Sequence, residues 1–217
     1  MKRLILFLFA FHFSLLAFAQ MNEVFASMPD SLLPLLPEKA RRDMLDFYQN
    51  HMEAKVRNRL SEYAFLDTLT DTYLRLTSSK ASTVEIKLLQ TSDSLPILAL
   101  IRTVAAPIRD SHVEFYDTLW HRLPWLRLPV PTTAEYFPAV PDSLRPALDL
   151  VQRSIDDLRL VEVTVSPDAP IFTLQVSAEV IGAPLASEQT EDIKSLARRF
   201  LCPLRYRWTG REFLALP

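Results

Sequence analysis

Hydrophobic positions beyond residue 20 first recur with a helical period. Ser31 is suited to cap a helical turn. Pro34 is tolerated in this turn, because the N–H groups of a first helical turn have no partner within the helix. Pro37 suits the first turn of a longer helix, which we expect to run to about Met52. The apolar stripe predicted to face the core comprises Ala40, Met44, Leu45, Tyr48 and Met52. The charged side chains of this helix, Arg41 among them, are expected on its solvent face.

Between Leu60 and Leu119 the hydrophobic period changes from 3.6 to 2, which predicts β-strands. The strand-like runs are residues 72–77, 83–88, 97–105 and 111–119. The third run is more continuously apolar than the others, as expected of a central strand. The links between the runs are short and leave no room for the crossover helices of a parallel sheet. We therefore expect an antiparallel β-meander.

Prolines interrupt the pattern over residues 123–141, where no periodic element fits. They are Pro124, Pro129, Pro131, Pro138 and Pro141. The elements expected beyond this stretch are a helix capped by Ser143, strands at 160–165 and 171–180, a helix at 188–200, and a hairpin over 204–216. The predicted fold class is α+β, with an antiparallel meander sheet packed against helices.

Two eight-residue segments, 29–36 and 141–148, share six identities. Duplication of a helix-plus-strands unit would explain the match and would give pseudo-repeat halves 20–122 and 139–217. Convergence on the same helix-start chemistry would explain it equally, because such starts demand Pro, Asp and Ser. Under either explanation we expect a single domain over residues 20–217.

Residues 1–19 have the features of a secretory signal peptide. Lys2 and Arg3 precede a thirteen-residue apolar run, and residues 17–19 offer the small-x-small pattern of a cleavage site. The run is too short for a comfortable membrane span, although an uncleaved anchor is the alternative. Cleavage after Ala19 leaves 198 residues with no further transmembrane segment. We expect an exported protein, periplasmic or secreted.

Composition excludes several common chemistries. The chain has two glycines, Gly182 and Gly210, whereas loops that cradle phosphate need several close together. The sequence also lacks the G-x-S-x-G motif of α/β-hydrolases. The single Cys202 excludes an internal disulfide, a Cys-x-x-Cys redox pair and a multi-cysteine zinc site. We expect no cofactor and no dedicated metal site.

The best candidate for catalysis lies on the last strand of the predicted meander. Alternation along a strand would project Asp110, His112 and Glu114 from one face. Two carboxylates and an imidazole could ligate a divalent metal or place a general base beside a carboxylate. The alternative is a half-buried strand that shows its polar side to water. Ser111 points to the opposite face, which disfavours a Ser-His-Asp triad.

Aromatic and arginine side chains supply candidate partner-binding residues. Trp120, Trp125 and Tyr136 could stack on sugar rings or anchor a protein partner, or they could pin the proline-rich stretch to the core. Arg205 and Arg207 are predicted to line one exposed face of the final hairpin. This face could meet an acidic protein, anionic polysaccharide or lipid headgroups, or simply complement the acidic remainder of the chain. Export and an acidic mature chain argue against nucleic acid.

Several segments resemble a family of exported proteins of unknown function from the Bacteroidales. They are residues 24–30 (Val-Phe-Ala-Ser-Met-Pro-Asp), residues 85–89 (Glu-Ile-Lys-Leu-Leu), residues 107–111 (Pro-Ile-Arg-Asp-Ser) with Phe115, Tyr116 and Trp120, and residues 208–213 (Trp-Thr-Gly-Arg-Glu-Phe). The resemblance implies a Gram-negative envelope protein, periplasmic in location. It implies no activity, cofactor or catalytic residue.

These observations favour a non-catalytic binding or accessory module for an envelope protein or glycan. One alternative is a metal-assisted hydrolase acting on an envelope substrate through Asp110, His112 and Glu114. A second alternative is a structural subunit of an envelope assembly.

Overall fold

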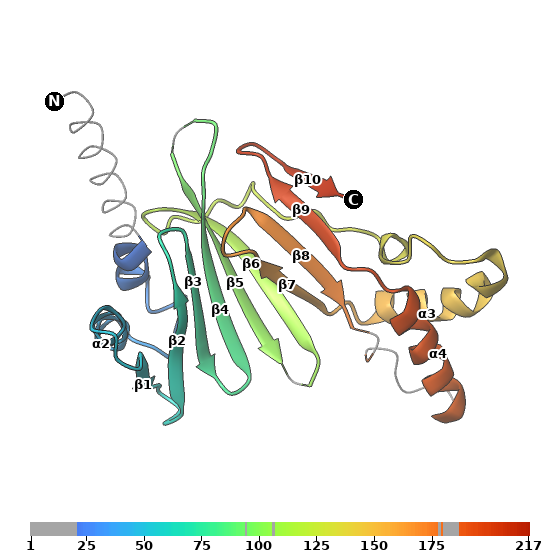
Figure 1. The fold of residues 1–217 in the computed structure, drawn as a ribbon, viewed down its shortest axis with the longest axis horizontal. Helices are drawn as coiled ribbons and strands as arrows, with labels where there is room; N and C mark the ends of the chain where they lie inside the picture. Colours follow the sequence, from blue (N-terminus) through green and yellow to red (C-terminus); the bar gives the residue numbers. More distant parts are fainter. Residues whose placement is uncertain (1–20, 94, 106, 178, 180–186) are drawn as a thin grey trace.

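The protein is an α+β fold built on two antiparallel sheets (Figure 1). The computed structural model describes residues 21–93, 95–105, 107–177, 179 and 187–217. The first sheet is a meander of β1 (Lys55–Arg57), β2 (Tyr63–Leu69), β3 (Tyr73–Ser79), β4 (Ser82–Leu89), β5 (Ile97–Ala105) and β6 (Arg109–Asp117). The second sheet has the order β10 (Phe213–Leu216), β9 (Leu204–Trp208), β8 (Ile171–Val176), β7 (Val161–Val165). The predicted fold class is confirmed.

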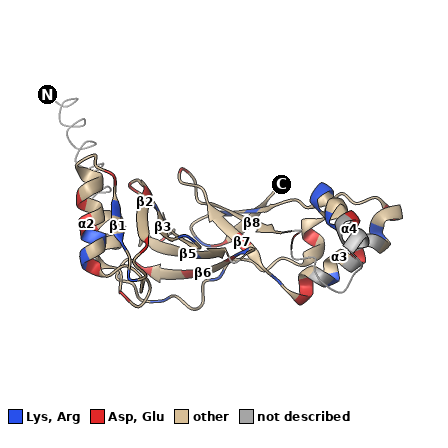
Figure 2. Cartoon of the chain, turned by 90° about the horizontal axis from the view of Figure 1, so that it is seen from below, with Lys and Arg blue, Asp and Glu red and all other residues tan. Residues whose placement is uncertain are grey.

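Helices lie at both ends of the elongated molecule, with the sheets between them (Figure 2). One end has α2 (Glu38–Gln49), and the other has α3 (Arg145–Asp157) and α4 (Ser187–Phe200). Residues 21–27 are also helical, and the proline-rich stretch contains only a 3₁₀ turn, η1 (Thr133–Tyr136), with another, η2 (Asp142–Leu144), just after it. Within the described ranges, none of the helices combines the length and the apolar character needed to cross a bilayer.

The first sheet is covered on both faces, which explains the continuous apolar run of β5. Leu98 and Leu100 pack into a core formed with α2 and helical residues 21–27. Ala99 and Ile101, on the opposite face, pack into a second core formed with the second sheet, α3 and α4. Because successive strand residues point to opposite faces, a strand between two cores is apolar at every position.

Two charged residues of β4, Glu85 and Lys87, are buried, although the alternation of polar and apolar residues along the strand indicates that they face solvent. Glu85 accepts a hydrogen bond from the Tyr73 hydroxyl at 2.5 Å and forms an ion pair with Arg75. The Lys87 ammonium donates to the carbonyl oxygen of Pro167 at 2.6 Å. The second sheet covers this face of β4, and these polar contacts compensate the buried charges.

Arg41 was expected on the solvent face of α2, and this expectation is wrong. Its side chain is 1% exposed, and its guanidinium donates to the backbone carbonyls of Phe25, Ala26, Met28 and Leu36 and to the carboxylate of Asp30. The carbonyls at a helix C-terminus have no partner within the helix. Arg41 therefore satisfies the end of helical residues 21–27 and fastens them to α2.

The two sheets are joined along the free edge of β7. The amide of Val161 donates to Asp110 Oδ1 at 3.2 Å, and the amide of Val163 donates to Ser111 Oγ at 2.9 Å. Arg109 and Glu162 form an ion pair at 2.9 Å beside them. Side chains of β6 thus satisfy amides that an edge strand would otherwise leave open.

Most element boundaries agree with the sequence pattern to within a few residues, and two differences have physical causes. Strand β2 was not predicted because a bulge between Leu66 and Thr68 breaks its alternation. Met52 was expected in the core, yet α2 ends before it and its side chain is exposed. The predicted hairpin turn is confirmed, since Gly210 adopts a φ of +96°.

The predicted signal peptide, residues 1–19, lies outside the described residues. One sheet is formed by residues before the stretch 123–141 and the other by residues after it, as a division into halves 20–122 and 139–217 predicts. The sheets differ, however, in the number of strands and in the connections between the strands. Residues 29–36 precede α2, whereas residues 141–148 include η2 and the first residues of α3. The duplication and the single domain over 20–217 therefore stay predictions.

Candidate binding groove

A groove of about 470 Å³ lies where β6, the proline-rich stretch and the second sheet meet. We call it the central groove. Its apolar lining consists of Val113, Phe115, Leu123, Pro124, Leu126, Leu128, Pro129, Val130, Pro131, Val161, Val163 and Leu174. Its polar lining consists of Ser111, His112, Glu114, Arg122, Arg127, Tyr136 and Arg159. This volume and mixture are typical of small-ligand sites.

The inner wall of the groove is the free edge of β6. All five residues from Ser111 to Phe115 line it, although neighbouring strand residues point to opposite faces. The groove therefore runs along the edge of the strand rather than over one of its faces.

The outer wall is the segment from Arg122 to Pro131. Arg122 forms a β-bridge with Tyr116, and the amide of Leu123 donates to the carbonyl of Phe115 at 2.8 Å. At the other end of the segment, the Arg159 guanidinium donates to the carbonyl of Pro131 at 3.1 Å. The wall is thus attached at both ends, and its prolines limit its backbone freedom.

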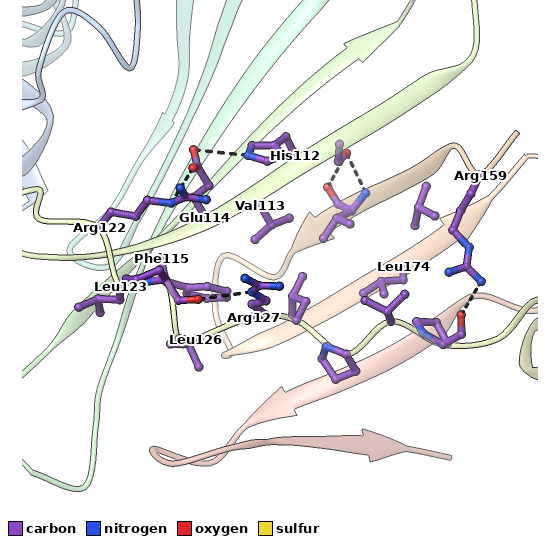
Figure 3. A pocket seen from close by; sticks show the side chains of 18 of the residues that line it. His112, Val113, Glu114, Phe115, Arg122, Leu123, Leu126, Arg127, Arg159 and Leu174 are labelled. Atoms are coloured by element: carbon purple, nitrogen blue, oxygen red, sulfur yellow. Dashed lines mark hydrogen bonds and ion pairs between the residues drawn. The ribbon is translucent and has the colours of Figure 1, made fainter.

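Positive charge predominates in the groove. Figure 3 shows Arg122 beside Glu114 and His112 towards one end, Arg159 towards the other, and Arg127 between them. Among the described residues that line the groove, Glu114 is the only carboxylate. Each guanidinium has five N–H donors, so the protein contacts found for Arg127 and Arg159 use only some of them.

Glu114 is held by cations and by a hydroxyl. Arg102 is hydrogen-bonded to Glu114 Oε2, Arg122 Nε lies 3.0 Å from Oε1, and the Tyr116 hydroxyl donates to Oε2 at 3.0 Å. Burial alone would raise the pKa of Glu114, but these contacts outweigh it and hold the pKa below its ordinary value. Glu114 therefore stays ionised at neutral pH and orients Arg122.

Tyr136 supplies a polar group whose bonding is incomplete. Its side chain is 2% exposed, and its buried hydroxyl has no hydrogen-bond partner among the described residues. Burial raises the pKa of this hydroxyl to about 12, so it stays protonated at neutral pH and retains a proton to donate. An unpaired buried hydroxyl costs about 1–3 kcal/mol, which a ligand group reaching it would recover.

The predicted catalytic trio shares a face of β6, but its members have different surroundings. Asp110 accepts the Val161 amide, whereas Glu114 is bound to arginines. His112 Nε2 lies 3.6 Å from Glu114 Oε2, and its side chain is largely exposed. The described part of the chain contains no group of three His, Cys, Asp or Glu residues placed to hold a metal ion. The arrangement supports structural roles for Asp110 and Glu114.

The aromatic candidates divide into buried and exposed side chains. Trp120 is 7% exposed, and its indole N–H donates to the carbonyl of Val24 at 3.0 Å, so it joins helical residues 21–27 to the sheet. Trp125 is 73% exposed and lies between two residues of the outer wall, Pro124 and Leu126. Of the two tryptophans, only Trp125 offers an accessible ring.

Arg205 and Arg207 are exposed on β9, while the alternate residues Tyr206 and Trp208 point into the core. Arg205 donates to the backbone oxygen of Pro217 at 2.8 Å. The hairpin therefore presents an arginine face, and its role in binding a partner stays a prediction.

Sequence reasoning missed the arginines of the groove. The placement of Arg122 and Arg127 within an apolar, proline-rich stretch is a local signal that singles them out. Arg159 follows α3 and joins them only through the fold.

Residues 14–213 match a protein family described as "Protein of unknown function (DUF3256)". The chain belongs to this family. The match includes every residue of the central groove, and the description assigns no activity to it.

A solved structure shows the same fold. It is described as "Structure of a domain of an uncharacterized protein from Porphyromonas gingivalis W83". It is 24% identical, with a TM-score of 0.72 over 91% of this chain and 98% of the other. The likeness extends to the overall fold alone. No curated protein matches the chain.

Proposed function

We propose that this member of the family is an exported, non-catalytic binding module for a component of the bacterial envelope, and that the central groove is its binding site. The observation that carries the proposal is a groove of about 470 Å³ whose apolar walls hold three arginines and one carboxylate. An envelope protein or a glycan with anionic groups would fit this charge.

The rigidity of the groove supports binding rather than turnover. Its inner wall is a strand of the first sheet, and both ends of its outer wall are hydrogen-bonded to the body of the protein. A preformed site binds with little ordering cost. Glu114, whose carboxylate lines the groove, is ionised and paired with Arg102 and Arg122, which leaves it poorly suited to act as a general base.

Photo-crosslinking in cells that export the full chain tests the proposal. Val130 lines the groove and is 76% exposed, so benzoylphenylalanine in its place should form a discrete adduct with an envelope component. The same amino acid in place of Leu60 is the matched control, since Leu60 is also exposed but lies between β1 and β2, at the opposite edge of the first sheet from β6. Arg127→Glu should reduce the adduct at Val130, because it reverses a charge in the groove.

Equal labelling from both positions, or no adduct at Val130, would contradict the proposal. Conversion of an envelope substrate by the purified protein would also contradict it. Export has its own test, since Edman sequencing of the processed protein should begin at Gln20.

A further inference from the structure

We infer that the central groove binds an extended, acidic peptide segment of a partner protein, which pairs with the backbone of β6 at Val113. This inference rests on the proposed function and assigns the mode of recognition. It is carried by the backbone geometry of β6 and by the charges beside it.

The backbone of Val113 faces the groove. The carbonyl of Phe115 points away from β5, because it accepts the amide of Leu123. In an antiparallel strand, residues two apart direct their N–H and C=O groups to the same side. Val113, two residues before Phe115, therefore directs both groups into the groove.

Other segments of the protein lie against this edge on both sides of Val113. The segment from His121 to Leu123 bonds the backbone of Phe115 and Asp117. At Ser111 strand β7 lies against the edge, because the Ser111 side chain accepts a hydrogen bond from the Val163 amide. Among the described residues, no backbone group bonds Val113 from the groove side. One residue of an added strand fits this gap and can make two hydrogen bonds to Val113.

The surroundings specify which residues that strand would carry. A residue paired with Val113 projects its side chain to the same face as Val113, towards Val163 and Leu174. Its two neighbours project to the opposite face, on the side of His112, Glu114 and Arg122. An apolar residue flanked by acidic residues complements both faces.

Charge decides between acidic and basic flanking residues. Arg102 and Arg122 outnumber Glu114 on that face, and Arg127 and Arg159 add further positive charge to the same region. A basic peptide would face repulsion along the whole groove. A neutral one would form no ion pairs with these guanidinium groups.

Selection from a library of phage-displayed heptapeptides tests the inference. Protein purified after production from its full sequence is the target, and the Val113→Pro variant is used for counter-selection. Proline removes the Val113 N–H without removing a bond to β5, because that N–H faces the groove. We expect enrichment of sequences in which an apolar residue is flanked by acidic residues.

Fluorescence anisotropy then measures the enriched peptide. N-methylation of its central amide should weaken the Kd about tenfold, the effect of roughly 1.4 kcal/mol from lost backbone bonding. Val113→Pro should have a similar effect, whereas Val113→Thr keeps the N–H and should retain affinity. Arg127→Glu should also weaken binding, and the exposed Arg57→Glu on β1 should not.

Each outcome is decisive. Failure to enrich peptides, enrichment of basic sequences, or equal binding of the N-methylated peptide overturns the inference. If the adduct at Val130 persists in any of these cases, the groove remains a binding site and only the peptide assignment fails. Because Val113→Pro could perturb the fold, the N-methylated peptide tests backbone pairing on the unaltered protein.

Discussion

Replacement of Arg41 by methionine should destabilise the protein far more than the same change at its neighbour Arg42. Both residues are arginines on α2, and methionine has a helix propensity similar to that of arginine. Arg41 is buried among backbone carbonyls, whereas Arg42 is exposed and paired with Glu38 at 2.8 Å. The comparison therefore isolates the contribution of the buried guanidinium.

The magnitude follows from the contacts that methionine cannot make. Arg41 donates to the carbonyl of Phe25 at 3.1 Å, to that of Leu36 at 2.6 Å and to that of Met28. Each buried carbonyl left without a donor costs about 1–3 kcal/mol, and methionine recovers part of this by apolar packing. The net loss should be about 3–5 kcal/mol, which corresponds to a fall in Tm of roughly 6–20 °C for a chain of this size.

Urea denaturation followed by circular dichroism provides the assay. Arg42→Met should cost about 0.5 kcal/mol or less, as expected for an exposed i,i+4 ion pair. Arg41→Lys keeps the charge and some donors and should fall between the two. If Arg41→Met loses less than about 1 kcal/mol, or no more than Arg42→Met, then Arg41 does not hold helical residues 21–27 in place and the reasoning fails.

Three further predictions concern the groove, the hairpin and the tryptophans. Glu114→Gln should lower the free energy of unfolding by about 1–3 kcal/mol at pH 7. Because folding depresses the pKa of Glu114, the difference between variant and wild type in urea titrations should shrink as the pH falls below 4.5. A difference independent of pH would contradict the assignment. Gly210→Ala should cost about 1–3 kcal/mol in the same titrations, since φ is +96° and the new Cβ would lie 3.1 Å from Ser92 Oγ; an unchanged midpoint would show that the turn tolerates a side chain. Trp125→Phe should remove most of the acrylamide-quenchable fluorescence at a cost below about 0.5 kcal/mol, whereas Trp120→Phe should retain it and lower the Tm; the reverse pattern would refute their assigned exposure.

Part of the candidate site follows from strand alternation alone. The sequence of β6 correctly places His112 and Glu114 on one face and Val113 and Phe115 on the other. It does not reveal that Glu114 meets Arg102 and Arg122, because cross-strand neighbours depend on register and on the path of the following loop.

Burial of charge was the least predictable property. The alternation of β4 correctly indicates a strand, yet Glu85 and Lys87 lie beneath the second sheet. Arg41 follows helical periodicity and still lies in the core, because the carbonyls at the end of another helix need its donors. A local pattern reports which side chains share a face, and it is silent on what later covers that face.

The sequence by itself determined the α+β class, the antiparallel meander, the helix after Pro37 and the hairpin at Gly210, because periodicity and turn chemistry act over a few neighbouring residues. The tertiary structure alone decided that β6 has an open backbone position at Val113 and that Arg122, Arg127 and Arg159 gather beside it. That site is assembled from segments that lie between residues 111 and 174, and only the packing of the second sheet against the edge of the first brings them together.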